Sequence, residues 1–532
     1  MKTVESLRSL MIFLGVTTLI ALCIVLGFGS GPGYAWLLDG LIALVAACAA
    51  VKTCARLALD TTPASRRAWQ VALAILALVC IGAIAQAFAH PTRPATVAGL
   101  LEFLTLELYL LAAALAVAAA RRRQFQSQHR IADIGDYARH LFVAYRLFKG
   151  LRHPSIGLKS FPGGKLGLDL ARFVWWFPKL APRVRDKFGI GIWKQFRDLF
   201  VVAVRHGLDT QNYYMFELYR SEVRARASGY LTRYETKNGL FKVLTWQWLK
   251  RQRRSKLSDK LETYRICQTH GIATVPILVV ARDGKLDYHC GGPAGLDQDL
   301  FLKPVKSKGS RGTEAILFSR GKFVTEQGAS LDREGVIALI AERSRAEPFL
   351  VQPRIVNHPG LADLADLALM RIRVVTILDD KGLPVMTHAV LSNLCKLEVN
   401  WPTDIELGAM IHLETGALGM MTGDKADMWL DWSEDHPVTK KRVLGRLVPC
   451  WDEVRSISLT AHAACNDRLL IGWDIAVGPK GAVLLEGNSY PDVDFLQRSH
   501  QCAIGDSSLG PLLYARLLEL EQAAEAGALV SP

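Results

Sequence analysis

Three oxygen-bearing side chains lie close together in the sequence near the C-terminus, in the stretch Ile471–Asn488 (IGWDIAVGPKGAVLLEGN). Asp474 comes first, and Glu486 and Asn488 follow, two residues apart. Side chains two apart on a strand point to the same face. Two carboxylates and an amide oxygen are hard ligands suited to Mg²⁺ held between protein and phosphates. The stretch therefore contains a candidate magnesium site, although a solvent-exposed hairpin with ordinary polar residues is the plainer alternative.

Two short strands joined by a turn would position these groups. The β-formers Ile475 and Val477 on one side and Val483–Leu485 on the other flank Pro479–Gly481, which supplies a turn. If the two strands pair, Asp474 and Glu486 come close together. The predicted hairpin is thus the element on which the candidate site depends.

A second stretch, Leu300–Ile316 (LFLKPVKSKGSRGTEAI), suits phosphate. It predicts a strand that carries Lys303, followed by a flexible loop over Lys306–Gly312. Glycines let the backbone approach a ligand closely, and hydroxyl and amide groups can donate to phosphate oxygens. The loop residues suited to this are Ser307, Gly309, Ser310 and Gly312.

Arg371–Leu378 (RIRVVTIL) predicts a strand with Arg371 and Arg373 on one face. A guanidinium binds phosphate or carboxylate with two parallel hydrogen bonds and stays charged. A structural salt bridge is the alternative for these arginines. Phe349–Ile355 (FLVQPRI) predicts a buried strand that follows a helix.

Length and composition set further bounds. A chain of 532 residues predicts about three domains. Its ten cysteines form no CxxC pair, and no histidine cluster has metal-ligand spacing. This argues against a disulfide framework or a zinc site and fits a reducing compartment. The formal charge of +14 suggests anionic partners.

Residues 1–124 predict four membrane-spanning helices. Apolar runs of bilayer length occur at Leu10–Phe28, Ala35–Val51, Trp69–Ala89 and within Ala95–Ala120. The first could instead be a secretory signal peptide, but further runs follow at once. Lys and Arg fall on alternate sides of the runs, so the positive-inside rule places the N-terminus and everything after Arg123 in the cytosol. The sequence therefore predicts an integral protein of the cytoplasmic membrane.

Residues 125–256 are strongly basic and include amphipathic helical patterns such as Ile192–Val204 (IWKQFRDLFVVAV). Basic residues beside aromatic ones suit nucleic acid, and they also suit a helical layer on anionic lipid headgroups. The neighbouring spans favour membrane lipids over nucleic acid as the partner. Solvated helix faces packed on a catalytic domain are the plainer alternative.

Several of these segments resemble the ATP-grasp superfamily. The string GWDIAV…VLLEGN is closest to its sugar-transfer associated proteins, which are similar to the alpha-L-glutamate ligase group. The helix start Asp259-Lys260, the Lys-Pro strand with its glycine loop, R-V-V-T at Arg373, and Leu208–Tyr219 also match. The resemblance extends from about Leu208 to Leu520.

The resemblance implies a role for each matched residue. Lys260 and Lys303 would contact ATP phosphates, the loop would close over them as a lid, and the backbone near Gln352 would hold adenine. Asp474, Glu486 and Asn488 would bind Mg²⁺. Lys303 and Arg373 would neutralise charge while the γ-phosphoryl group passes to a carboxylate, and an amine or hydroxyl would then attack the acylphosphate.

The acceptor region departs from the family pattern. Ser392 stands where related ligases carry an arginine, Val399 replaces an acidic residue before Asn400, and Met410–His412 replaces a commoner Gly-Val-Asp. These departures leave open an unusual substrate or a regulatory module that binds ATP without ligation. A membrane-bound glycosyltransferase is a third possibility, because Asp492-Val493-Asp494 has the spacing of a DxD metal pair.

We therefore expect an all-α four-helix transmembrane domain (1–124), a basic helical connector (125–256) and an α/β ATP-grasp domain of two lobes with mixed or antiparallel sheets (257–525). The lobes would divide into a nucleotide-binding part (257–350) and a metal-binding part (351–525). The expected activity is Mg-ATP-dependent ligation of a carboxylate to an amine or hydroxyl. The acceptor would belong to envelope polysaccharide synthesis and could be a lipid-linked glycan.

Overall fold

The computed structural model of the chain describes residues 166–233, 236–241, 244–245, 248, 257, 259–306, 312–365, 369–395 and 405–526. The chain divides into two compact units, of which the second comprises Met215–Glu217 and Gly229–Pro532. The first unit comprises the remainder, and each unit is described by itself. The four predicted spans lie outside the described residues, as do parts of the predicted connector.

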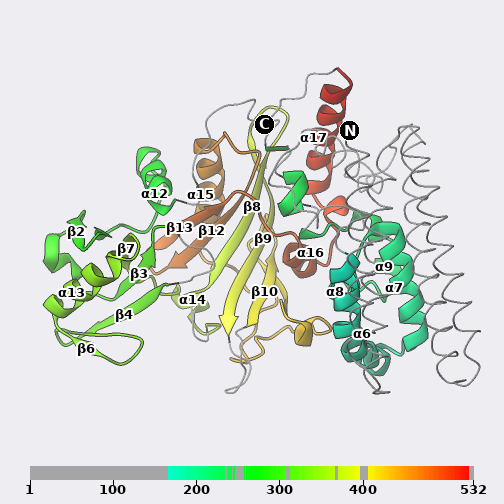
Figure 1. Ribbon diagram of the computed structural model, residues 1–532, viewed down its shortest axis with the longest axis horizontal. Helices are drawn as coiled ribbons and strands as arrows, with labels where there is room; N and C mark the ends of the chain where they lie inside the picture. The colour runs from blue at the N-terminus through cyan, green and yellow to red at the C-terminus, as the bar shows by residue number, and fades with distance from the viewer. Residues whose placement is uncertain are drawn as a thin grey trace, which may run out of the picture. The chain divides into compact units, whose positions relative to one another are not determined.

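The first unit contains short helices, coloured cyan to green in Figure 1. In α7, buried Gln195, Leu199 and Val202 recur at helical spacing while Trp193 is exposed, so the predicted amphipathic helix is confirmed. Its Gln195 donates to the carbonyls of Ala181 (3.0 Å) and Ile190 (2.7 Å), joining α7 to the end of α6. The elements are α6 (Leu166–Phe188), α7 (Ile192–His206), α8 (Thr210–Met215), α9 (Ser221–Arg224) and η3 (Ala227–Gly229).

The prediction of an integral membrane protein has to be corrected. Within the described ranges, no helix combines the length and the apolar character needed to cross a bilayer. The longest, α6 with 23 residues, has charged side chains along its length, including Asp169, Lys179 and Arg185. Charged groups at such intervals are costly in hydrocarbon.

The second unit contains two antiparallel sheets. One has seven strands in the order β2-β1-β7-β3-β4-β5-β6, and the other has six in the order β11-β10-β9-β8-β12-β13. Figure 1 shows the long strands β8 and β9 side by side. The first sheet comprises β1 (Val279–Arg282), β2 (Lys285–Tyr288), β3 (Leu300–Pro304), β4 (Glu314–Ser319), β5 (Lys322–Val324), β6 (Ser330–Leu331) and β7 (Phe349–Pro353). The second comprises β8 (Arg371–Leu378), β9 (Pro384–Cys395), β10 (Ile405–Ile411), β11 (Leu418–Gly423), β12 (Leu470–Gly478) and β13 (Gly481–Asn488).

Helices cover these sheets. α13 packs its buried Val336 and Ile340 onto the seven-stranded sheet, and the Asp332 side chain caps it by accepting from Gly335 N (2.8 Å). The remaining helical elements are η4 (Thr236–Leu240), α12 (Lys260–Thr269), η5 (Gly292–Leu296), α13 (Arg333–Ser344), α14 (Pro359–Ala362), η6 (Ala426–Met428), α15 (Trp451–Ala464), α16 (Asp494–His500), η7 (Ile504–Asp506) and α17 (Leu509–Glu525).

The six-stranded sheet has an apolar face and a polar face. α15 presents Val454, Ile457 and Ala461 to the apolar face, where Trp473 and Ile475 of β12 join the same core. Because side chains alternate along a strand, residues next to these point to the other face. That polar face is the one on which the candidate site lies.

Candidate functional site

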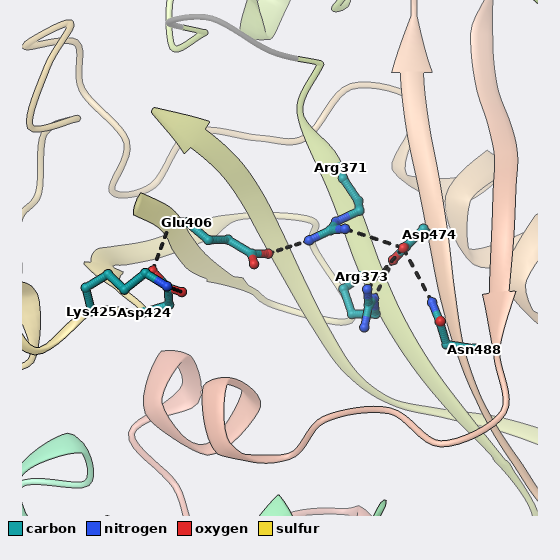
Figure 2. A network of polar contacts seen from close by, with 7 residues as sticks. All are labelled: Arg371, Arg373, Glu406, Asp424, Lys425, Asp474 and Asn488. Atoms are coloured by element: carbon teal, nitrogen blue, oxygen red, sulfur yellow. Dashed lines mark hydrogen bonds and ion pairs between the residues drawn. The ribbon is translucent and has the colours of Figure 1, made fainter. Parts of the chain in front are cut away.

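The predicted hairpin forms, with β12 and β13 paired antiparallel. Asp474 pairs with Glu486, and Asn488 pairs with Gly472, so the predicted closeness of the two carboxylates is confirmed. Asn488 Nδ2 lies 3.5 Å from Asp474 Oδ2 (Figure 2). All three groups thus meet on the polar face.

The turn of this hairpin depends on Gly481. Its φ is +113°, a backbone conformation that L side chains rarely adopt, and a Cβ there would lie 2.6 Å from Glu453 Oε2. That carboxylate accepts a hydrogen bond from Ala482 N (2.9 Å) and so ties the turn to α15. The turn therefore sets the direction in which β13 runs back along β12.

Asp474 is almost fully buried, and Arg373 is its principal partner. Arg373 lies opposite Asp474 in the β8–β12 ladder, its Nε donates to Oδ1, and its Nη2 donates to Oδ2 at 3.0 Å. Burial alone would lower the pKa of Arg373, but the charge of Asp474 and their hydrogen bonds raise it. Arg373 therefore stays charged, and its two hydrogen bonds fix the orientation of the carboxylate.

Glu486 has a raised pKa, first because it is buried and second because Asp474 lies beside it. Lys260 and Arg373 partly oppose this shift. A divalent cation would relieve the repulsion between the two carboxylates, and Asn488 would add an amide oxygen, so the donor chemistry fits Mg²⁺. Across the described ranges, no three His, Cys, Asp or Glu side chains are grouped so that they could hold a metal. The candidate site has two carboxylates, and its third group is the Asn488 amide.

Two lysines of the predicted nucleotide site interact electrostatically with Glu486. Lys303 lies on β3, and burial, followed by the nearby charge of Lys260, lowers its pKa to about 8 despite Glu486. Lys260 donates to the Pro304 carbonyl (3.2 Å), and burial lowers its pKa against the opposing charge of Glu486. The structure thus brings Lys260 of α12 and Lys303 of β3 within electrostatic reach of Glu486 on the hairpin.

Other predicted site residues occupy different surroundings. Gln352 is buried on β7 and donates to the Val275 carbonyl (2.9 Å), so its side chain is held within the protein. Gly312, at the end of the loop between β3 and β4, has φ +73° and packs near Pro304. Ser307, Gly309 and Ser310 lie outside the described residues.

α12 starts at the Asp259-Lys260 pair that the sequence indicates as a helix start. Its cap is Asp259, whose side chain accepts from the backbone N–H groups of Leu261 and Glu262. Asp259 therefore caps the helix, and Lys260 is its first residue.

A further polar network, which was not predicted from the sequence, lies on this face. Arg371 Nη2 donates to Glu406 Oε1 at 2.5 Å, and its Nη1 lies 3.6 Å from Asp474 Oδ2. Glu406 N donates to Asp424 Oδ1 (3.0 Å), and Lys425 Nζ lies 3.1 Å from the other oxygen of Asp424. Figure 2 shows these charges extending from the hairpin across β8 and β10. The alternation of Arg371 with Arg373 was the one sequence signal for this network.

The departures in the acceptor region are only partly described. Ser392 is buried on β9 and pairs with Arg371 in the ladder. Met410 and Ile411 end β10, and His412 follows, whereas Val399 and Asn400 lie outside the described residues. Ser392, where related ligases carry an arginine, therefore lies next to Arg371 of β8.

The aspartates of the candidate DxD pair are both engaged at the start of α16. Asp494 Oδ1 accepts from Arg233 N (2.8 Å), and Asp492 Oδ1 accepts from Asp494 N (3.1 Å). Arg233 Nε also lies 3.3 Å from Asp492 Oδ2. These contacts favour a structural role for the pair.

Comparisons with known proteins agree with this geometry. The family model of sugar-transfer associated ATP-grasp domains matches residues 243–506, and the fold with its two antiparallel sheets is that of an ATP-grasp domain. Residues 243–506 thus form a sugar-transfer associated ATP-grasp domain, which confirms the resemblance found in the sequence. Members of the ATP-grasp superfamily are ATP-dependent ligases and typically use Mg²⁺.

Solved structures of ligases are similar at low identity. They include D-alanine–D-alanine ligase from Bacillus anthracis (12% identity, TM-score 0.30, covering 50% of this chain and 69% of that one). VanG D-Ala:D-Ser ligase from Enterococcus faecalis has 12% identity and TM-score 0.30, covering 50% of this chain and 61% of that one. D-alanine–D-alanine ligase from Coxiella burnetii has 12% identity and TM-score 0.28, covering 51% of this chain and 61% of that one. The chain thus spans less than two thirds of the length of the last two. No curated protein matches the chain.

Proposed function

We propose that the chain is a carboxylate ligase that activates an acid with Mg-ATP and joins it to an amine or a hydroxyl. One observation carries the proposal: the charges of Lys260, at the start of α12, and of Lys303, on β3 of the other sheet, act on Glu486 of the hairpin. Anionic ligands for a metal and cations for phosphates therefore lie on the two sides of one site. Membership in the ATP-grasp family supports the same conclusion.

Each group has a proposed task. Asp474, Glu486 and Asn488 would hold Mg²⁺, which supplies charge neutralisation on the phosphates when it is bound. Lys260 and Lys303 bind phosphate oxygens, and the loop residues Ser307, Gly309, Ser310 and Gly312 would donate to the same phosphates. The backbone beside Gln352 receives adenine. Arg373 holds Asp474 in the orientation that the site requires.

The reaction balances in two steps. A carboxylate oxygen of the acid attacks the γ-phosphorus, the bond to the β-phosphate oxygen breaks, and ADP leaves. The amine or hydroxyl then attacks the acyl carbon, loses its proton, and displaces inorganic phosphate to give an amide or an ester. The family's association with sugar transfer supports a glycan as the source of the acid or of the acceptor.

Hydroxylamine tests this proposal without knowledge of the natural acceptor, since it converts an acylphosphate to a hydroxamate. The full chain, incubated with Mg-ATP and a set of amino and uronic acids, should form hydroxamate and ADP in equal amounts. Glu486→Gln and Lys303→Ala should abolish both products. A matched control is Arg442→Ala, which removes an exposed ion pair with Glu434. Unchanged turnover in Glu486→Gln would reject the proposal.

A second candidate is an ATP-binding regulatory module without ligase activity. The observation that favours it is the Arg373 guanidinium, which already occupies both oxygens of Asp474. Tight Mg-ATP binding together with no ADP release in the presence of every tested acid would support this module over the ligase.

A further inference from the structure

Arg371 differs from Arg373 in how its guanidinium is used. Both lie on the polar face of β8, but the Arg373 fork is closed on Asp474. Arg371 makes one short ion pair, with Glu406, and 31% of its side chain is exposed. Its Nη1 lies 3.6 Å from Asp474 Oδ2, so the guanidinium sits at the edge of the proposed metal and phosphate site. It is thus a cation beside the reacting groups that can still accept a ligand.

Small residues follow Arg371 across the sheet. In the ladder it pairs with Ser392 of β9, and Ser392 pairs with Gly408 of β10. A Cβ at Gly408 would lie 2.6 Å from the ring of Phe495, so α16 covers the sheet there directly. Phe495 therefore covers the face at Gly408, whereas Arg371 and Glu406, which lies two residues before Gly408 on β10, are partly exposed.

Glu406 is held in place from two directions. Its backbone N–H donates to Asp424 Oδ1 (3.0 Å), and its Oε1 accepts from Arg371. With 27% of its side chain exposed, it is half-buried. If Arg371 turns to an oxyanion, the Glu406 carboxylate loses its cation and needs another donor, since a desolvated acceptor without a partner is destabilising.

We propose that Arg371 and Glu406 form the subsite for the acid substrate. This proposal rests on the ligase function proposed above. Arg371 binds the oxyanion of the acid, first as carboxylate and then as acylphosphate, with the two-pronged geometry that suits both groups. Glu406 accepts a hydrogen bond from a hydroxyl or ammonium group of the same molecule. The substrate class is therefore a carboxylic acid that carries a nearby hydroxyl or amino group, such as a uronic acid or an amino acid.

Binding of inorganic phosphate tests the role proposed for Arg371, which is to bind the oxyanion. Calorimetric titration of phosphate into the full chain saturated with Mg-ADP should show binding, and Arg371→Ala should weaken it about tenfold or more while Mg-ADP affinity stays unchanged. Glu406→Gln should tighten phosphate binding, because it releases Arg371. The control Arg442→Ala removes an ion pair of the same type away from the hairpin and should change neither affinity.

The outcomes separate this inference from the function on which it rests. Wild-type phosphate affinity in Arg371→Ala overturns the inference alone, as does weaker phosphate binding in Glu406→Gln. A wild-type chain that fails to bind Mg-ADP overturns the proposed function. A general structural defect in Arg371→Ala would lower Mg-ADP affinity too, and that result would also contradict the specific role.

A comparison of acids with and without a hydrogen-bond donor group tests the role proposed for Glu406. L-Glutamate and D-glucuronate carry a donor group, and glutarate serves as an acid that lacks one. At least one of the first two should bind the Mg-ADP complex more tightly than glutarate, and Glu406→Ala should remove that preference. Preference for glutamate would identify an amino acid, and preference for glucuronate would identify a uronic acid. A wild-type chain without either preference overturns the role of Glu406.

Discussion

Arg373 of β8 and Asp474 of β12 are 101 residues apart in sequence, yet they face each other in the sheet and are joined by two hydrogen bonds. The carboxylate is almost fully buried, with 2% of its side chain exposed. A buried charge that loses its partner is strongly destabilising because no solvent replaces the lost interaction. The pair therefore stabilises the sheet as well as positioning the proposed metal ligand.

Replacing Arg373 by alanine should consequently destabilise the chain by about 3–5 kcal/mol. Urea unfolding of the full chain, followed through the transition of the second unit, measures this change in the free energy of unfolding. Arg442→Ala breaks an ion pair whose two side chains are each 54% exposed, and it should change stability by less than about 1 kcal/mol. Equal effects of the two substitutions would contradict the role assigned to Arg373.

Glu486→Gln should stabilise the free protein at neutral pH. The folded-state pKa of Glu486 is raised, so the folded state binds its proton more tightly than the unfolded state does. Stability therefore falls as pH rises from the ordinary glutamate pKa through the raised one. Wild-type unfolding followed from pH 4 upward should show this fall superimposed on other titrations, and Glu486→Gln should lack it. A variant less stable than wild type at pH 7 would count against burial as the cause.

Lys303 should take up a proton when the nucleotide binds. Its pKa of about 8 means that part of the population is neutral at a pH near that value, and an adjacent triphosphate favours the charged form. Calorimetry in buffers of different ionisation enthalpy should detect proton uptake on Mg-ATP binding at pH 8.5. Lys303→Met should abolish the uptake, and unchanged uptake in that variant would assign the proton to another group.

The same lowered pKa has a consequence for stability. Between about 8 and the ordinary lysine value, the unfolded chain binds more protons than the folded one, so wild-type stability should rise with pH in that window. Lys303→Met should lose this rise and be more stable than wild type at pH 7. A flat wild-type profile over the window would contradict the proposed environment of Lys303.

Gly481→Ala should loosen the hairpin. The positive φ and the clash with Glu453 Oε2 together should cost about 1–3 kcal/mol of unfolding free energy. Gly445→Ala is the matched control, because Gly445 also has a positive φ (+80°) but no atom lies within 4 Å of the added Cβ. Unfolding experiments should find a smaller loss of unfolding free energy for Gly445→Ala than for Gly481→Ala.

The sequence predicted the local features well, because they depend on neighbouring residues. The hairpin follows from its β-formers and the turn at Gly481, and β8 begins and ends at the predicted residues, Arg371 and Leu378. The strand that carries Lys303 was likewise predicted from its own residues.

Features that depend on strand register could not be predicted from the sequence. The Arg371–Glu406 pair joins β8 to β10 across β9, and the pairing that brings these residues together is set by the tertiary packing of the sheet. The apolar runs of residues 1–124 led to a localisation that the described helices do not support.

We propose above all that the hairpin carboxylates hold a metal beside a nucleotide bound by Lys260 of α12 and Lys303 of β3. The most direct measurement is the affinity of a non-hydrolysable ATP analogue for the wild-type chain and for Glu486→Gln, each titrated with and without Mg²⁺. We expect Mg²⁺ to strengthen binding to wild type by at least about tenfold and to have little effect on the variant. Equal Mg²⁺ dependence in the two proteins would contradict it.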